Sequence, residues 1–120
     1  MSVNNETFNA AWLKAWSDKD VSRLLGFYAP DTTYIDQQTA RGIKGHDALR
    51  AYLEGLFGAT PEMIYTPDEV WPIAGGFCGR WYCAIGPNGS AGRLRGFDLV
   101  LLKDGLIAHN EVYVHPMPAA

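Results

Sequence analysis

The sequence is poor in positive charge, in cysteine and in long apolar runs. Its 10 Lys and Arg residues are outnumbered by 13 Asp and Glu residues, which gives a formal net charge of −3. Proteins that bind nucleic acid or anionic membranes through charge carry a basic surface, so we expect neither partner. No apolar run approaches the roughly 20 residues of a membrane span. Residues Met1–Glu6 lack the charged and apolar regions of a signal peptide, so we expect a cytoplasmic protein.

The sequence also lacks the patterns that hold metals and cofactors. The two cysteines, Cys78 and Cys83, would lie about 16 Å apart on opposite faces of one strand, too far for a disulfide. The histidines are scattered, without a helical pair or a cluster of carboxylates, so we expect no metal ion. The pair Gly75-Gly76 lies between two expected strands rather than before a helix, which is not the setting of a phosphate loop. We therefore expect no cofactor.

What the chain does contain is typical of one globular domain spanning residues 1–120, with 48% hydrophobic and 19% charged residues. Three apolar stripes at helical spacing predict three helices. The second stripe ends at Pro30, and the third begins near Asp47 and ends with Gly58 as its C′ residue. The stripes consist of Phe8, Ala11, Trp12, Ala15 and Trp16; of Val21, Leu24, Leu25 and Tyr28; and of Leu49, Tyr52, Leu53, Leu56 and Phe57.

Runs of β-branched and aromatic residues between turn signals predict a sheet. The loop Gln37–Gly45 has room for a short strand around Arg41–Lys44, and Pro67 and Pro72 indicate a bulge or an edge. Asp104-Gly105 predicts a tight hairpin turn. Helices followed by an antiparallel meander indicate an α+β domain. The expected strands are Thr32–Asp36, Met63–Trp71, Phe77–Ile85, Arg93–Lys103 and Leu106–His115.

The strand Arg93–Lys103 is apolar on both faces. Phe97, Leu99 and Leu101 lie on one face, while Val100 lies on the other. Helices are expected to cover one face, and a second copy of the chain is the simplest cover for the other. We therefore expect a homodimer through the outer face of the sheet.

Two aspartates interrupt these apolar strands. Tyr34 and Asp36 point to the same face, so a tyrosine that faces the interior brings a carboxylate with it. Asp98 breaks the apolar run Gly96–Leu102. A buried carboxylate is costly unless it is hydrogen-bonded, paired or protonated, so both residues need an explanation. In a shared apolar pocket their pKa values would move apart, which suits one to act as a base and the other as a proton-bearing donor.

Structural explanations remain open for both aspartates. Asp36 could bind the turn that follows it, Gln37–Thr39, and Asp98 could pair with an arginine on a neighbouring strand, namely Arg80, Arg93 or Arg95. The aromatic residues that would line the pocket could equally be plain core. These candidate wall residues are Trp12, Tyr28, Tyr34, Tyr52 and Trp81.

The order of elements, together with the segments Phe27–Asp36 and Arg41–Leu49 and the late strands around Phe97-Asp98 and Asp104–Ile107, resembles a known family. It is similar to the SnoaL-like and ketosteroid-isomerase branch of the nuclear transport factor 2-like superfamily. The resemblance covers nearly the whole chain. It implies a cone in which a curved, mainly antiparallel sheet wraps over three N-terminal helices and encloses a pocket, commonly in a dimer.

The resemblance also implies roles for individual residues. Asp36 matches the general base of the isomerase, and Asp98 matches the carboxylic acid that stays protonated and donates to the enolate oxygen, a division of roles known for that enzyme. Tyr28 matches a supporting tyrosine. Trp12 stands where the isomerase has its principal oxyanion tyrosine, and an indole N–H lacks the acidic hydroxyl. We therefore do not expect steroid isomerisation itself.

Two other branches of the family place their chemistry differently. Polyketide cyclases use histidine and aspartate on the last strand, where this chain has His109, Asn110 and Glu111. By the expected register Asn110 faces the pocket and the other two do not, although a slip of one residue would reverse this. Limonene-epoxide-hydrolase relatives have an Arg-x-Asp arrangement, whereas Arg95 and Asp98 are one residue further apart and point to opposite faces. Epoxide hydrolysis is therefore the weaker alternative.

Three hypotheses follow. The first is a cofactor-independent isomerase or cyclase acting on a small hydrophobic carbonyl compound, with Asp36 and Asp98 as catalytic residues. The second is a module of the same fold that binds a small hydrophobic ligand without turnover. The third is an assembly domain whose cavity is closed. In the first hypothesis the substrate is oriented by Trp12, Tyr28, Tyr34, Tyr52, Trp81 and Asn110.

Overall fold

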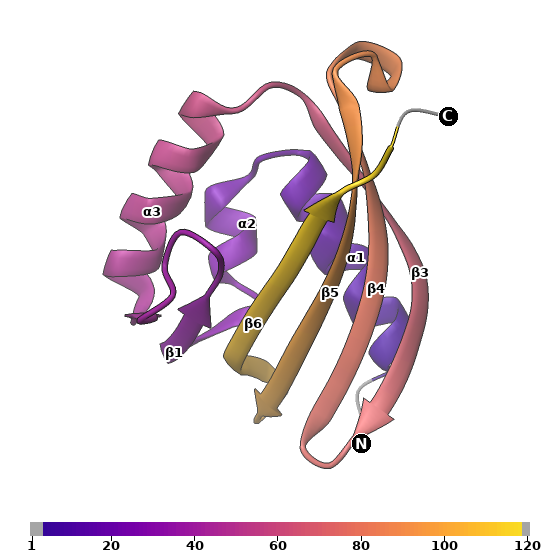
Figure 1. The fold of residues 1–120 in the computed structure, drawn as a ribbon. Helices are drawn as coiled ribbons and strands as arrows, with labels where there is room; N and C mark the ends of the chain where they lie inside the picture. Colours follow the sequence, from indigo (N-terminus) through magenta and orange to yellow (C-terminus); the bar gives the residue numbers. More distant parts are fainter. Residues whose placement is uncertain (1–3, 119–120) are drawn as a thin grey trace.

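A computed structural model describes residues 4–118 of the chain (Figure 1). Six strands form one sheet in the order β2-β1-β6-β5-β4-β3, in which β1 and β6 are parallel and the other neighbours antiparallel. The strands are β1 Tyr28–Ile35, β2 Ile43–Lys44, β3 Met63–Ile73, β4 Gly76–Ile85, β5 Gly92–Lys103 and β6 Leu106–Pro116. The helices are α1 Asn5–Ser17, α2 Val21–Leu25, α3 His46–Ala59 and the short 3₁₀ turn Pro87–Gly89.

The helices α1 and α2 begin at residues whose side chains cap free backbone N–H groups. The side chain of Asn4 accepts a hydrogen bond from the backbone N–H of Thr7 at 3.0 Å, and Asp20 does the same at the start of α2. The α3 helix has no basic residue in its last turn. Lys19 supplies the charge from the loop after α1, since its ammonium group donates to the carbonyl of Thr60 at 2.6 Å. This contact fixes α3 relative to α1.

The sheet bends around α1, and α2 and α3 close the side next to β1 (Figure 1). The core lies between the helices and the inner face of the sheet. As predicted, β5 alternates, with Asp98 and Val100 buried on the inner face and Phe97 exposed on the outer one. The expected α+β architecture is confirmed. Three N-terminal helices describe the fold only loosely, because α3 follows the first two strands.

The predictions of a bulge near Pro67 and of a tight turn at Asp104-Gly105 are confirmed. The register between β3 and β4 shifts between Pro67 and Val70, where the proline predicted a bulge. Asp104 and Gly105 both have positive φ angles, +54° and +78°, as the tight hairpin between β5 and β6 requires. Both cysteines are free thiols. None of the helices among residues 4–118 is long and apolar enough to cross a membrane.

Two expected helix ends were wrong. The second helix ends at Leu25, and Tyr28 begins β1 instead of completing the helical stripe. The reason is tertiary pairing: Tyr28 lies opposite Ile107 of β6, and an irregularity before Thr33 accommodates Pro30 within the strand. At the other site, α3 continues through Gly58 to Ala59, so Gly58 is inside the helix. Asp36 lies just beyond β1 rather than within it.

Candidate active site

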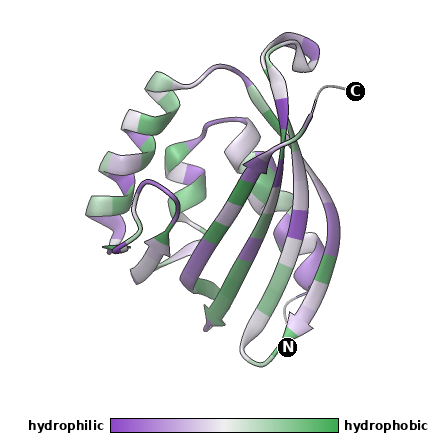
Figure 2. Ribbon diagram, viewed as in Figure 1, coloured by the Kyte–Doolittle hydropathy of each residue, from purple (hydrophilic) through white to green (hydrophobic). Residues whose placement is uncertain are grey.

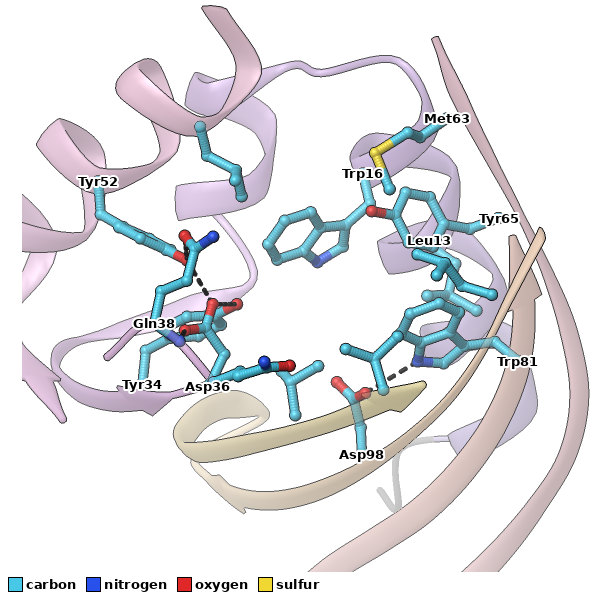
Figure 3. Close-up of a pocket in the computed structure, with 15 residues that line it drawn as sticks. Leu13, Trp16, Tyr34, Asp36, Gln38, Tyr52, Met63, Tyr65, Trp81 and Asp98 are labelled. Carbon is cyan, nitrogen blue, oxygen red and sulfur yellow. Dashed lines mark hydrogen bonds between the residues drawn. The ribbon is translucent and has the colours of Figure 1, made fainter. Parts of the chain in front are cut away.

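A cavity of about 290 Å³ opens between α1, α3 and the inner face of the sheet (Figure 3). This volume is at the lower end for small-molecule sites. The wall is apolar and aromatic apart from two aspartates and two glutamines. The lining residues are Leu13, Trp16, Tyr34, Asp36, Gln37, Gln38, Tyr52, Leu56, Met63, Tyr65, Trp81, Leu94, Asp98, Val112 and Val114.

Asp98 is a buried carboxylate at the wall of this cavity, with 3% of its surface exposed. One oxygen accepts a hydrogen bond from Trp81 Nε1 at 2.8 Å, and the other accepts one from Asn110 Nδ2 at 3.0 Å. Burial raises the pKa of Asp98 to about 6, because desolvation outweighs the two hydrogen bonds that favour the charged form. The alternative of an ion pair with arginine is wrong: Arg80 binds Asp68 and Glu69, and Arg93 and Arg95 are exposed on the other face of β5.

A buried chain of hydrogen bonds fixes the orientation of Asn110. Trp12 Nε1 can only donate, and it donates to the Tyr28 hydroxyl at 3.2 Å. The Tyr28 hydroxyl in turn donates to Asn110 Oδ1 at 2.9 Å, which leaves the Asn110 amide nitrogen facing Asp98. This row of hydrogen bonds therefore presents a donor to Asp98, and Asn110 cannot accept a proton from it. A proton on Asp98 must occupy a lone pair outside these two bonds.

Asp36 also lines the cavity, and it is saturated with donors. Its Oδ1 atom accepts from the backbone N–H groups of Gln38 and Thr39, each at 2.9 Å, and from the Thr39 hydroxyl. Its Oδ2 atom accepts from the hydroxyls of Tyr34 at 2.9 Å and Tyr52 at 2.5 Å. The turn interpretation of Asp36 is thus confirmed, and the same carboxylate also faces the cavity (Figure 3).

A continuous row of aromatic rings connects the two carboxylates. Tyr52, Tyr34, Trp16, Tyr65 and Trp81 follow one another with centroid separations of 5.7, 6.3, 6.1 and 5.0 Å. The indole nitrogen of Trp16 faces the open space, and neither it nor the Tyr65 hydroxyl is hydrogen-bonded to another cavity residue (Figure 3). Burial raises the pKa of the Tyr65 hydroxyl, so it remains a donor. Trp16 and Tyr65 therefore each bring to the cavity wall a donor that no other cavity residue accepts.

Gly96 allows Trp81 to lie flat against β5. A Cβ atom at position 96 would come within 2.0 Å of the Trp81 ring. Any larger residue would therefore displace the indole whose N–H group binds Asp98. The glycine that breaks the apolar run of β5 is needed for this close approach.

The predicted site residues divide into two groups. Tyr34, Tyr52 and Trp81 line the cavity with both aspartates, as predicted. Trp12, Tyr28 and Asn110 do not; they lie behind the wall, at 1% exposure or less, and act through Asp98. The sequence reasoning missed Trp16 and Tyr65. Their signals were the spacing of Trp16 one helical turn after Trp12, and the alternation of Tyr65 with Met63 on β3.

The expected register of β6 was right. Val112 and Val114 face the cavity, while His109 and Glu111 lie on the outer face and pair with each other at 2.7 Å. His109 is thus remote from the cavity. Within residues 4–118, no three His, Cys, Asp or Glu side chains are grouped so that they could hold a metal ion.

Replacing Asn110 with leucine is expected to destabilise the protein by about 1 to 3 kcal/mol at neutral pH. The change leaves the Tyr28 hydroxyl without an acceptor and takes one of two donors from buried Asp98. Urea unfolding measures the loss, with His109→Leu on the outer face of the same strand as the control. Equal stability of the two variants would show that the buried chain contributes nothing.

The chain was compared with known families, curated proteins and solved structures. No curated protein matches it significantly. A putative ketosteroid isomerase from Kribbella flavida superposes with a TM-score of 0.72 at 15% identity, over 95% of this chain and 78% of that one. TerC, co-crystallised with polyporic acid, superposes with a TM-score of 0.75 at 15% identity, over 91% of this chain and 89% of that one. A nuclear transport factor 2-like protein of unknown function from Pseudomonas putida KT2440 superposes with a TM-score of 0.67 at 21% identity, over 89% of this chain and 81% of that one.

At these identities the structural matches establish the fold alone. The sequence itself matches the family model of the SnoaL-like domain over residues 10–110. This range includes α3, both aspartates and most of the cavity wall. The chain therefore belongs to the SnoaL-like domain family.

Proposed function

We propose that the protein is a cofactor-independent enzyme that moves a proton on a small hydrophobic carbonyl compound, in an isomerase- or cyclase-type reaction. The observation that carries the proposal is Asp98, a carboxylate in an apolar cavity with no cationic partner. Its pKa of about 6 leaves it ionised at neutral pH and more basic than an ordinary aspartate. A base of this kind suits removal of a proton next to a carbonyl group.

The hydrogen bonds favour a division of roles opposite to that implied by the resemblance. Asp98 lines the cavity and accepts two side-chain hydrogen bonds, one on each oxygen, so it retains free lone pairs and is the better candidate for the base. Asp36 accepts hydrogen bonds from five donors, which leaves it little capacity to take a proton, so it is the poorer candidate for the base and contributes to the site through its charge. The Trp16 indole N–H and the Tyr65 hydroxyl, which no other cavity residue accepts, are candidates to hold the enolate oxygen that forms when the proton leaves.

The comparisons support this class of chemistry without specifying the reaction. The matching structures include a putative ketosteroid isomerase and a protein co-crystallised with a small organic molecule. Both are similar to this chain along most of its length. They make an isomerase or cyclase the natural first hypothesis for a member of this family with a carboxylate in its cavity.

The test is incorporation of solvent deuterium. The protein is incubated in heavy water with a panel of small hydrophobic ketones, and loss of the α-proton signal is followed by NMR. Asp98→Asn and Asp36→Asn are run in parallel, with Asp31→Asn as a control on the exposed part of β1. Exchange that depends on Asp98 supports the proposal, and exchange that depends on Asp36 alone restores the division of roles implied by the resemblance.

The second candidate function is ligand binding without turnover. It is favoured by the engagement of Asp36 with the turn amides of Gln38 and Thr39, which is a structural use of that carboxylate. Ketones that bind in the cavity but never exchange their α-protons would favour this function over the enzyme.

We also propose that the protein forms a homodimer through the outer face of β3 to β6. Phe97 is 40% exposed and Tyr113 is 59% exposed on this face. Trp71 packs against Phe97, with 5.9 Å between the ring centroids. Figure 2 shows hydrophobic residues along β5 and β6, and these belong to both faces of the sheet: Val100 and Ile107 are buried, whereas Phe97 is exposed. Burial of such a patch is the usual reason that two copies associate.

The expected result is a dimer in sedimentation at micromolar concentration, and Phe97→Arg is expected to shift it to monomer. Asp31→Arg, which introduces the same side chain on β1, should leave the dimer intact. A wild-type protein that sediments as a monomer would contradict the proposal.

A further inference from the structure

All the charged residues that line the cavity are acidic. Its lining residues include two aspartates and no Lys, Arg or His. Lys19, on the loop after α1, donates to the carbonyl groups of Phe57 and Thr60. A ligand that carries a negative charge would therefore meet two carboxylates with no cation to offset them.

At the end of the cavity formed by Asp36, Tyr34 and Tyr52, the carboxylate and the two hydroxyls offer acceptors, and the only side-chain donors left to a ligand among these lining residues are the neutral amides of Gln37 and Gln38. Both tyrosine hydroxyls donate their single proton to Asp36 Oδ2, so their remaining lone pairs are what a ligand would meet. Burial raises the pKa of both hydroxyls, which keeps them protonated in this arrangement. A ligand group that carries a hydrogen-bond donor or a positive charge therefore complements the carboxylate and hydroxyl oxygens at this end.

Aromatic rings continue from this end along the cavity. Trp16 stacks on Tyr34 with an interplanar angle of 28°, and Tyr52 tilts against Tyr34. The π-faces of Trp and Tyr attract cations, and this attraction grows when water is excluded. Rings and a carboxylate that lie together in this way form a site for a positive charge on an apolar group.

We propose that the cavity binds an organic cation, a protonated or quaternary amine with apolar substituents, whose charge lies against Asp36 and the rings of Trp16, Tyr34 and Tyr52. The inference rests on the proposed function in taking this cavity as the substrate site, and it adds that the substrate carries an amine. The carbonyl part of the same molecule then lies toward Asp98. Carboxylates, phosphates and other anions are excluded as substrates.

The experiment compares three small molecules of nearly equal shape by calorimetry and by tryptophan fluorescence. The first is choline, the second is its neutral isostere with carbon in place of nitrogen, and the third is the carboxylate of that carbon skeleton. Choline is expected to bind at least about tenfold more tightly than the neutral isostere. The carboxylate is expected to show no binding.

Variants identify the group responsible. Asp36→Asn is expected to reduce the preference for choline to about threefold or less, since it keeps the shape and removes the charge. Tyr52→Phe keeps both the ring and the carboxylate, so the preference should persist. Asp31→Asn is the matched control, because Asp31 is exposed on the same strand and lies outside the cavity.

The inference is overturned if choline and the neutral isostere bind equally, if the carboxylate binds more tightly, or if choline does not bind. Its failure is distinguishable from failure of the proposed function. Exchange of ketone α-protons without a preference for cations removes this inference alone. A preference for cations without any exchange removes the proton-transfer reaction alone.

Discussion

Replacing Asp98 with asparagine is expected to slow the exchange of substrate α-protons at least about a hundredfold. A positioned general base typically contributes between about 10² and 10⁴ in rate, and asparagine has nearly the same shape without the basic oxygen. The wild-type rate is expected to rise with pH through about 6, because only the ionised Asp98 can accept a proton. The dependence of the rate on pH is measured by NMR in heavy water.

The effect must be separated from damage to the fold. The Asp98→Asn variant should still bind the ketone, as judged by fluorescence of the cavity tryptophans Trp16 and Trp81. Asp31→Asn should exchange at the wild-type rate. A rate that survives the loss of Asp98, or that shows no change near pH 6, would assign the base to another group.

The free energy of unfolding is expected to fall by about 3 kcal/mol as the pH rises from 4 to 7 through the titration of Asp98. Its pKa moves from 3.8 to about 6 on folding. Each unit corresponds to about 1.4 kcal/mol. Between these values the folded protein holds a proton that the unfolded chain has released, so raising the pH favours unfolding. This contribution is fully present below pH 4 and is lost as the pH rises through 6.

Other groups also titrate in this range, so the comparison with a variant is essential. Urea unfolding at a series of pH values is measured for the wild type and for Asp98→Asn. The wild type should lose stability relative to the variant as the pH rises. A difference in free energy of unfolding between the two proteins that stays constant from pH 4 to 7 would mean that the pKa of Asp98 is the same in the folded and unfolded states.

Much of the architecture could be predicted from local patterns. Alternation along β5 placed Asp98 inside and Phe97 outside, and the register of β6 separated Val112 from His109. Strand alternation is reliable because a slip of one residue would bury a charged face. The C-terminal end of α2 was not predictable in this way, because the pairing of Tyr28 with Ile107 involves a residue far along the chain.

The sequence was enough to predict which carboxylates belong to the candidate site. It was not enough to predict which aromatic residues reach the cavity and which lie behind its wall. A charged residue in an apolar run identified Asp98, and the aromatic spacing of α1 identified Trp12 as a residue of the interior. Which tryptophan of α1 reaches the cavity depends on how the helix is rotated against the sheet. The structure gives that position to Trp16 and places Trp12 behind it, hydrogen-bonded to Tyr28. Periodicity alone does not distinguish two residues one turn apart.

The central claim is that Asp98 is a cavity carboxylate that changes its charge near neutral pH. The most direct measurement is an NMR titration of its side-chain carboxyl carbon, assigned by comparison with Asp98→Asn. We predict a midpoint at a pH of about 6, with Asn110→Leu shifting it higher because one donor to the charged form is lost. A midpoint below about 4, in the ordinary range of aspartate, would contradict the account.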